Sequence, residues 1–307
     1  MYNISQLRGN ADTAMNLFLQ LLGNGLVQGA VAVLYAACFG FVYRSFRVFH
    51  IAMGAQFVFA CYAFYTCAAV CKLPIVVSVP TVLVLSAAFA ALIECAVYRP
   101  FAQKRCSSGV VMIASLGVMI VLENVVALIY GNEVKTISNQ LEPSAAFAGL
   151  RFTRIQLLQF FVGLGVFAAV GAAVRYGKWF KALWAMGDQP ELLPVLGLPV
   201  RWLRLGVMML GGVLVAIPAM LISWDIGMDP HVGMHYLLLG SVAVFFGGVD
   251  RYWAWGAGAM LLAALQSLAV WKFSAQWTDL VTFGVLIFVL LFRPQGLFGL
   301  RKRLEET

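Results

Sequence analysis

Charged residues are scarce in this chain: Asp, Glu, Lys and Arg make up 11% of its 307 residues, whereas 62% are hydrophobic. A soluble domain carries about 25% charged residues, so this sequence has too few to cover a water-exposed globule. Roughly 20 apolar residues cross the hydrocarbon core of a bilayer as a helix, which leaves room here for about eight or nine spans. The composition therefore predicts an all-α, polytopic integral membrane protein.

Several motifs that carry chemistry are also missing from the sequence. It has no Walker A motif, no GxGxxG after a strand and no CxxC pair. Its six cysteines are spread along apolar runs and one basic loop, and His231 and His235 have no evident third ligand. We therefore expect no metal site, no cofactor bound by this chain and no catalytic residues.

Acidic residues are outnumbered, 13 against 21 Lys and Arg, which gives a net charge of +8. The basic residues gather in short loops between apolar runs, and such loops lie in the cytoplasm by the positive-inside rule. This pattern favours membrane orientation over nucleic-acid binding as the reason for the charge. It predicts a cytoplasmic C-terminus and, with nine spans, an outer N-terminus; eight spans would apply if one run does not cross. The basic residues are Arg44, Arg47, Arg99, Lys104, Arg105, Arg175, Lys178, Lys181, Arg201, Arg204, Arg293, Arg301, Lys302 and Arg303.

Nine apolar runs define the expected spans. In hydrocarbon, backbone polar groups must be paired within the segment, so these runs are predicted helices. The seventh run is short and forms with the eighth either two spans or one broken, re-entrant pair. The first run is too long for the core of a cleavable signal. We expect a polar segment at 1–16, one membrane domain at 17–299 and a tail at 300–307. The runs cover about 17–43, 50–70, 74–98, 109–130, 155–175, 203–223, 236–249, 254–270 and 277–292.

Polar residues within the apolar runs are candidates for a solute pathway, because they are costly in a bilayer. Gln56, Glu123 and Asn124 are the pathway candidates, with hydrogen bonding between helices as the alternative role for Glu123 and Asn124. Gln266 also lies within a run, and Asp279 follows a tryptophan at a predicted membrane boundary.

Two further positions within or beside these runs have predicted structural roles. Gly54 permits close backbone approach near the start of its helix. Glu94 is five residues from Arg99, at the cytoplasmic end of its run, and is expected to anchor that end or to pair with Arg99.

The polar segment 177–197 lies between two predicted spans and carries charges of both signs. Lys178 to Met186 is predicted to form a short amphipathic helix that presents Phe180, Leu183 and Trp184 on one side. A turn at 187–190 follows, with Asp188 capping a second short helix that ends at Gly197. Such a helical pair fits a groove on a partner protein, or alternatively lies flat on lipid.

Six segments spread along the chain follow the pattern of one family: Gly25–Gly29, Arg47–Gly54, Glu94–Pro100, Gly177–Gly197, Pro230–Gly233 and Leu291–Gly299, of which the last is the most specific. Through them the chain resembles, nearly from end to end, the permease subunits of branched-chain amino acid ABC transporters. It departs from the family pattern at His50, Met53 and Ala55, at prolines 190 and 194, and in the aromatic, charged stretch 247–257.

This resemblance implies a transport subunit of the inner membrane. A periplasmic solute-binding protein would deliver the solute, a second related or identical permease subunit would enclose the path, and two ATPase subunits would hydrolyse ATP and drive alternating access. It implies that segment 177–197 contacts the ATPases, through Lys181, Ala182, Gly187, Asp188, Glu191 and Gly197. It implies structural roles for Gly54, Glu94, Arg99, Pro100, Pro230, Gly233, Arg293, Pro294 and Gly296. A permease for urea or short amides, a stand-alone transporter or channel, and a membrane scaffold are the alternatives.

Overall fold

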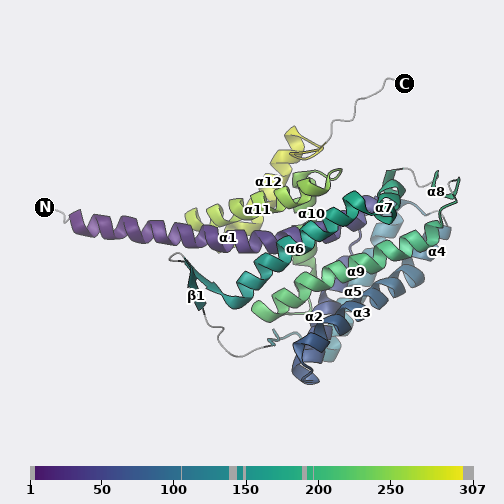
Figure 1. Ribbon diagram of the computed structural model, residues 1–307, viewed down its shortest axis with the longest axis horizontal. Coiled ribbons are helices and arrows are strands. Elements are labelled where there is room, and N and C mark those ends of the chain that lie inside the picture. The colour runs from purple at the N-terminus through teal and green to yellow at the C-terminus, as the bar shows by residue number, and fades with distance from the viewer. Residues whose placement is uncertain are drawn as a thin grey trace.

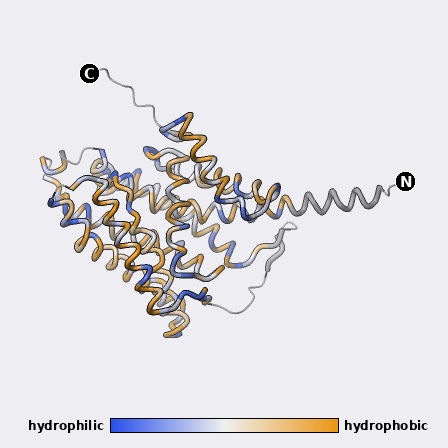
Figure 2. Tube along the Cα trace, turned by 180° about the vertical axis from the view of Figure 1, so that it is seen from behind, coloured by the Kyte–Doolittle hydropathy of each residue, from blue (hydrophilic) through white to orange (hydrophobic). Residues whose placement is uncertain are grey.

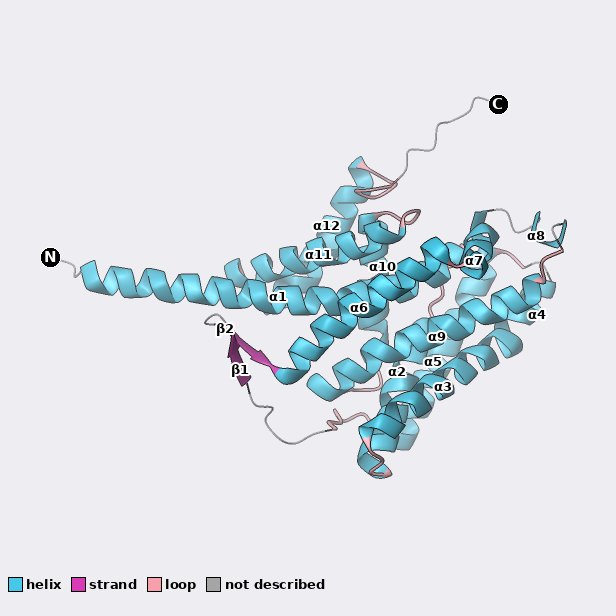
Figure 3. Ribbon diagram, in the orientation of Figure 1, coloured by secondary structure: helices cyan, strands magenta, loops and turns pink. Residues whose placement is uncertain are grey.

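The computed structural model describes residues 4–104, 106–137, 144–147, 150–188, 192–195 and 197–299 (Figure 1). Helices joined by loops make up this part of the chain, together with one antiparallel pair of short strands, β1 and β2 (Figure 3). The predicted tail at 300–307 and four positions of the predicted coupling segment, Gln189, Pro190, Glu191 and Leu196, lie outside the described residues.

The elements follow one another with short connections. In the first half they are α1 (Ile4–Phe46), α2 (Met53–Tyr65), η1 (Thr66–Val70), α3 (Ile75–Ile93), η2 (Glu94–Tyr98), α4 (Arg99–Gln103), α5 (Ser108–Tyr130), β1 (Ser144–Phe147) and β2 (Leu150–Thr153). In the second half they are α6 (Arg154–Tyr176), α7 (Lys178–Asp188), α8 (Leu192–Val195), α9 (Val200–Asp225), α10 (Val232–Gly247), α11 (Tyr252–Lys272), η3 (Ala275–Trp277) and α12 (Thr278–Phe292).

Seven helical segments of the described chain are long and apolar enough to cross a bilayer, and two shorter apolar helices, α10 and α12, accompany them. Each of the nine corresponds to one predicted run, so the predicted all-α, polytopic class is confirmed. Helix α10 has 16 residues, about 24 Å at 1.5 Å per residue, which is short for a full crossing. It is separated from α11 by the turn at 248–251 rather than continuous with it.

Helix α1 is the centre of the bundle. It contacts α10 and α11 on one side and α6 and α9 on the other, and Figure 1 shows it running between these groups. Its apolar window is 89% buried, whereas the windows of α5 and α6 are 11% buried. Figure 2 shows hydrophobic residues, in orange, along the described helices. The outer helices therefore present apolar side chains to lipid, while the apolar window of α1 is packed mostly against protein.

The two ends of the bundle differ in charge. The end that carries Arg44, Arg99, Arg175 and Arg204, here called the basic face, is the one that loop charge predicts to be cytoplasmic. At the opposite end, here called the outer face, the backbones of Lys135 and Met228 exchange two hydrogen bonds of 2.9 Å. This bridge holds the two predicted outer loops together.

Two glycines far apart in sequence allow α2 and α10 to meet. A Cβ atom on Gly233 would lie 2.3 Å from the carbonyl oxygen of Gly54, and one on Gly54 would lie 3.0 Å from that of Gly233. No other residue type fits at such a backbone-to-backbone contact. The close approach predicted for Gly54 is present, and its partner is the glycine that ends the Pro230–Gly233 turn.

The segment after α12 pairs with the end of α10. Gly296 has a positive φ of 81°, and beyond it the Leu297 and Phe298 amides donate to the carbonyls of Phe246 and Gly247, at 2.9 and 2.8 Å. The last carbonyls of a helix have no partner within it, so these bonds satisfy groups that α10 leaves open. Arg293 and Pro294 are exposed beside this contact.

Candidate functional site

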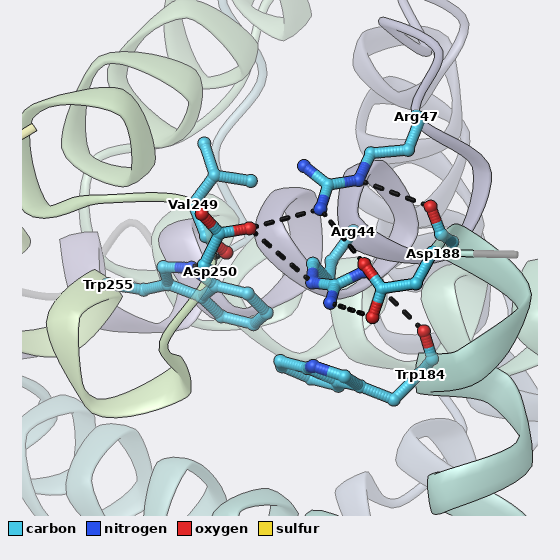
Figure 4. Close-up of polar contacts among 8 residues, drawn as sticks. Arg44, Arg47, Trp184, Asp188, Val249, Asp250 and Trp255 are labelled. Atoms are coloured by element: carbon cyan, nitrogen blue, oxygen red, sulfur yellow. Dashed lines mark hydrogen bonds and ion pairs between the residues drawn. The ribbon is translucent and has the colours of Figure 1, made fainter. Parts of the chain in front are cut away.

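Four charged side chains from three parts of the chain meet on the basic face (Figure 4). Arg44 lies in the last turn of α1 and Arg47 just after it, Asp188 ends α7, and Asp250 lies in the α10–α11 turn. Arg44 Nη2 is 2.6 Å from Asp188 Oδ2, and Arg47 Nη2 is 3.0 Å from Asp250 Oδ1. We call these four residues the arginine–aspartate cluster.

Each arginine of the cluster contacts both aspartates. Arg47 Nη2 is 3.4 Å from Asp188 Oδ1, and Arg44 Nε is 4.0 Å from Asp250 Oδ1. Two positive and two negative charges therefore balance, as burial requires: the Arg44 side chain is 5% exposed, although that of Asp188 is 51% exposed. The cluster joins α7 to α1 and to the α10–α11 turn.

The arginines also close the C-terminal end of α7. Arg44 Nη1 donates to the carbonyl of Trp184 and Arg47 Nε to that of Gly187. Cations are favourable at a helix C-terminus, where carbonyls lack partners and the dipole is negative. Burial by itself raises the pKa of Asp188, but hydrogen bonds and charge from the two arginines outweigh it and leave that pKa below its ordinary value. The Asp188 carboxylate is therefore ionised at neutral pH.

Aromatic side chains next to the arginine–aspartate cluster form a second contact, between α7 and α11. Trp184 of α7 stacks on Trp255 of α11, with ring centroids 5.6 Å apart, and the Arg44 guanidinium lies 5.1 Å from the Trp184 ring. Trp255 is fully buried and its Nε1 donates to the carbonyl of Val249 at 3.1 Å. The indole therefore fixes both the turn that carries Asp250 and the position of α7.

Gly187 lets α7 approach the backbone of α1. A Cβ atom at this position would lie 1.8 Å from the carbonyl oxygen of Arg44. This contact brings Asp188 within hydrogen-bond distance of Arg44. The position of Asp188 therefore depends on the absence of a side chain at Gly187.

The remaining coupling candidates lie around this joint. Helix α7 buries Leu183 and Met186 and exposes Lys181 and Ala185, so the predicted amphipathic helix is present. Ala182 is half-buried beside the joint, and Gly197, with a positive φ of 72°, follows α8. The predicted turn at 187–190 was placed too early, because α7 continues through Asp188. That residue does not cap a second helix; its carboxylate is held by the two arginines instead.

The three pathway candidates are not brought together. Gln56 is buried near the basic face, with Nε2 at 3.4 Å from His50 Nε2, and His50 Nδ1 is hydrogen-bonded to the Tyr98 hydroxyl. Glu123 is 3.9 Å from His231 near the outer face. Asn124 is exposed on α5 and donates to the Ile120 carbonyl of its own helix. A shared pathway role for the three stays a prediction.

Glu94 pairs with a residue from another helix. Its Oε1 is 3.0 Å from Arg204 Nε, so the expected pairing with Arg99 is wrong. Helix α9 packs along α3 and brings Arg204 directly to the carboxylate. Pro100 occupies the first turn of α4, where its missing N–H costs nothing, and Pro230 is buried at the outer face.

The chain matches a known protein family over most of its length. The family described as branched-chain amino acid transport system / permease component matches residues 21–290. The chain belongs to this family. It is 25% identical to the high-affinity branched-chain amino acid transport system permease protein BraD of Pseudomonas aeruginosa, and 24% identical to the corresponding LivH of Escherichia coli K12. Both alignments cover 94% of this chain and 98% of the relative.

A solved structure is similar at lower identity. PsaBC from Streptococcus pneumoniae in complex with Fab aligns with a TM-score of 0.49 and 13% identity, over 90% of this chain and 92% of that one.

Membership of the family makes the chain a permease component, which is a transport subunit that crosses a membrane several times rather than an enzyme.

The stretch that departs from the family pattern forms one side of the contact among α1, α7 and the α10–α11 turn. Segment 247–257 supplies Asp250 and Trp255, which contact α1 and α7. The sequence shows Arg44 and Arg47 only as loop charges that set orientation, and the stretch only as a departure. The sequence did contain a signal for this contact. Asp250 and Trp255 lie close together in a segment at the basic face, and Trp184 lies in the helix that is predicted to contact the ATPases.

Replacing Asp250 with alanine is expected to lower the stability of the chain by about 2 kcal/mol, because it removes hydrogen bonds between charged groups and leaves a buried arginine with one counter-ion. The midpoint of thermal unfolding in detergent measures this loss. Glu133→Ala is the matched control, since Glu133 is exposed on the outer face; it should change stability by less than about 0.5 kcal/mol. Equal midpoints for the two variants would contradict a stabilising cluster.

Proposed function

We propose that this chain is the membrane subunit of an ATPase-driven importer of branched-chain amino acids or a related small polar solute, in the inner membrane with its C-terminus in the cytoplasm. The relatives named above are components of branched-chain amino acid transport systems, which supports the solute class. Two ATPase subunits, a second permease subunit and a periplasmic binding protein complete the proposed complex. The ATPase subunits hydrolyse ATP, and this chain converts their movement into a change of access.

The observation that carries the proposal is the attachment of α7. Asp188 of α7 is tied by ion pairs to Arg44 of α1, which is the most deeply packed span, and to Arg47 just after it. The same two arginines contact Asp250 in the turn between α10 and α11. The other side of α7 exposes Lys181 and Ala185 on the basic face. A partner that grips the exposed side and moves α7 would therefore move the centre of the bundle. A helix that docks in this way inserts one face into a groove on its partner.

A bulky residue on the exposed side of α7 tests the proposal. Ala185→Trp is expected to lower retention of the ATPase subunits by at least about tenfold during purification of the tagged chain, because a docking groove shaped for alanine excludes an indole and a loss of about 1.4 kcal/mol is tenfold in affinity. The retained proteins are identified by mass spectrometry. The fold should be unaffected, since Ala185 is exposed on α7.

Ala168→Trp is the matched control, because Ala168 is exposed on α6 within a span and faces away from the basic face. It should retain the ATPase subunits as the parent chain does. Retention that is equal in both variants would reject α7 as the docking helix. Purification of the parent chain without any ATPase would reject the importer and favour a transporter or channel that acts alone.

A further inference from the structure

A cavity of about 550 Å³ lies at the basic face, between the start of α9 and the segment formed by η2 and α4. None of the four residues of the arginine–aspartate cluster lines it. Deeper in the bundle α9 is in close contact with α3, because a Cβ atom on Gly212 would lie 2.7 Å from the carbonyl oxygen of Ser86. The cavity lies beyond this contact, toward the basic-face ends of both helices. Its lining includes Glu94, Arg99, Gln103, Arg201, Trp202 and Arg204.

The wall of this cavity is positively charged. It contains three arginines and one carboxylate. Arg204 is compensated, because its Nε lies 3.0 Å from Glu94 Oε1 and its guanidinium lies 5.0 Å from the Phe46 ring. Arg99 and Arg201 make no hydrogen bond or ion pair with another residue of the described chain. One carboxylate balances one arginine, so two positive charges remain without a counter-ion in the wall.

The cavity lies at the level of the membrane surface. Trp202 in its wall is 69% exposed, and tryptophan is enriched where the hydrocarbon meets the headgroups. Leu92 is exposed on α3 about two helical turns before Arg99, or roughly 10 Å deeper in the bundle. Met209 is exposed at a similar depth below Arg201 on α9. Apolar surface suited to acyl chains therefore lies directly beneath the charged cavity.

This combination favours an anion that carries an apolar tail. A guanidinium presents a planar fork of N–H donors that matches the oxygens of a phosphate. Basic pockets between transmembrane helices on the cytoplasmic side are suited to anionic lipid headgroups. A small free anion would leave the exposed apolar side chains below the cavity uncovered. A zwitterionic headgroup carries its own cation, so it gains less from two unpaired arginines.

We propose that this cavity binds the headgroup phosphate of an anionic phospholipid in the cytoplasmic leaflet. Arg99 from α4 and Arg201 from α9 donate hydrogen bonds to the phosphate oxygens, and the exposed apolar side chains below them contact the acyl chains. The bound lipid adds to the Glu94–Arg204 ion pair in joining the basic-face ends of the two segments. The choice of leaflet rests on the proposed orientation of the chain, whereas binding itself does not depend on the ATPase subunits.

Lipid-induced stabilisation of the purified chain in a neutral detergent tests the site without any partner. Phosphatidylglycerol should raise the midpoint of thermal unfolding, because a ligand that binds the folded state stabilises it. Phosphatidylcholine with the same acyl chains should not, and neither should sn-glycerol 3-phosphate, which has the phosphate without the chains. These two arms distinguish an anionic phospholipid from lipid in general and from a free phosphate ester.

The double substitution Arg99→Gln/Arg201→Gln should weaken the apparent affinity for phosphatidylglycerol at least about tenfold, because each basic side chain near the surface contributes to the attraction. Without added lipid this variant should unfold at the midpoint of the parent chain, since neither side chain has a partner that would be left unpaired. The two readouts separate loss of binding from loss of folding.

Arg175→Gln/Arg251→Gln is the matched control. It removes two exposed arginines from the same face, both outside the cavity wall, and so changes the net charge equally. Its response to phosphatidylglycerol should equal that of the parent chain. An equal loss in both double variants, or a response to phosphatidylcholine as large as that to phosphatidylglycerol, would overturn the site. An equal response to sn-glycerol 3-phosphate would overturn the lipid as its occupant.

A protein partner and a failure of the importer function are recognised separately. If the parent chain shows no phosphatidylglycerol response but Arg99→Gln/Arg201→Gln loses the ATPase subunits, the two arginines belong to a protein interface and the lipid site is refuted. A chain that retains its ATPases in both forms and shows no lipid response refutes the lipid site alone. A chain that responds to phosphatidylglycerol but retains no ATPase refutes the importer and keeps the lipid site.

Discussion

Gly187→Ala should abolish coupled solute uptake while leaving the chain folded in the membrane. A Cβ atom at this position would lie 1.8 Å from the Arg44 carbonyl, and the atom it meets is backbone, which cannot rotate away. Helix α7 must move off the end of α1, and Asp188 then loses the 2.6 Å contact with Arg44. Uptake into proteoliposomes that contain the complete complex should fall at least about tenfold, which corresponds to about 1.4 kcal/mol of lost docking energy.

The matched control for this change is Gly165→Ala in α6, where a Cβ atom would meet nothing within 4 Å. It should transport as the parent chain does and be slightly more stable, since alanine favours a helix by about 1 kcal/mol over glycine. The amount of membrane-inserted chain, measured by immunoblot, should be equal in both variants. Normal uptake by Gly187→Ala would show that the approach of α7 to α1 is not needed for coupling.

Gly233→Ala should destabilise the bundle itself. The added methyl group would lie 2.3 Å from the Gly54 carbonyl oxygen, so the start of α10 must separate from the start of α2. Overpacking at a backbone contact costs about 3 kcal/mol, and the thermal unfolding midpoint in detergent should fall accordingly. Expression in the membrane should fall with it, because α2 and α10 both pack on other buried helices.

Gly117→Ala in α5 controls for the loss of glycine, because a Cβ atom there also meets nothing within 4 Å. Its midpoint should equal or exceed that of the parent chain. A Gly233→Ala chain as stable as Gly117→Ala would mean that the α2–α10 contact relaxes without cost, and the tight crossing would then have no structural importance.

The helices and the amphipathic segment were predictable because their signals are local. Nine apolar runs and nine apolar helices correspond, since backbone pairing in a bilayer forces each run into a helix. Helix α7 was predicted from the spacing of Leu183 and its neighbours, and it ends two residues later than expected, at Asp188. The extension follows from capping by Arg44 and Arg47, each of which lies 140 residues before the carbonyl that it caps.

Contacts between distant segments were not predictable in the same way. Glu94 has Arg99 near it in sequence, but its ion-pair partner is Arg204, because helix packing rather than sequence distance brings charges together. Asn124 has the polarity expected of a pathway residue and faces the exposed side of α5. A run that is apolar all round carries no moment that tells which side meets protein, so the facing of α5 cannot be read from it.

The residues that line a cavity of about 230 Å³ at the outer face illustrate the same limit. Asp225 and Asp279 look like ordinary outer-loop and boundary residues in sequence, and a tyrosine within an apolar run looks like core. Only the arrangement of six helices around one cavity places Tyr35, Asp225 and Asp279 on a common wall. The Gly54 contact was half predictable, because glycine indicates close approach but does not name the partner.

The pairing of the chain's last described segment with α10 sets an order of events during biosynthesis. The carbonyls of Phe246 and Gly247 receive their amide partners from Leu297 and Phe298, which the ribosome adds about 50 residues later. The end of α10 therefore stays incomplete until the segment that follows α12 has been added. The turn that carries Asp250 begins directly after α10, so the Arg47–Asp250 ion pair reaches its finished form only after that segment is in place.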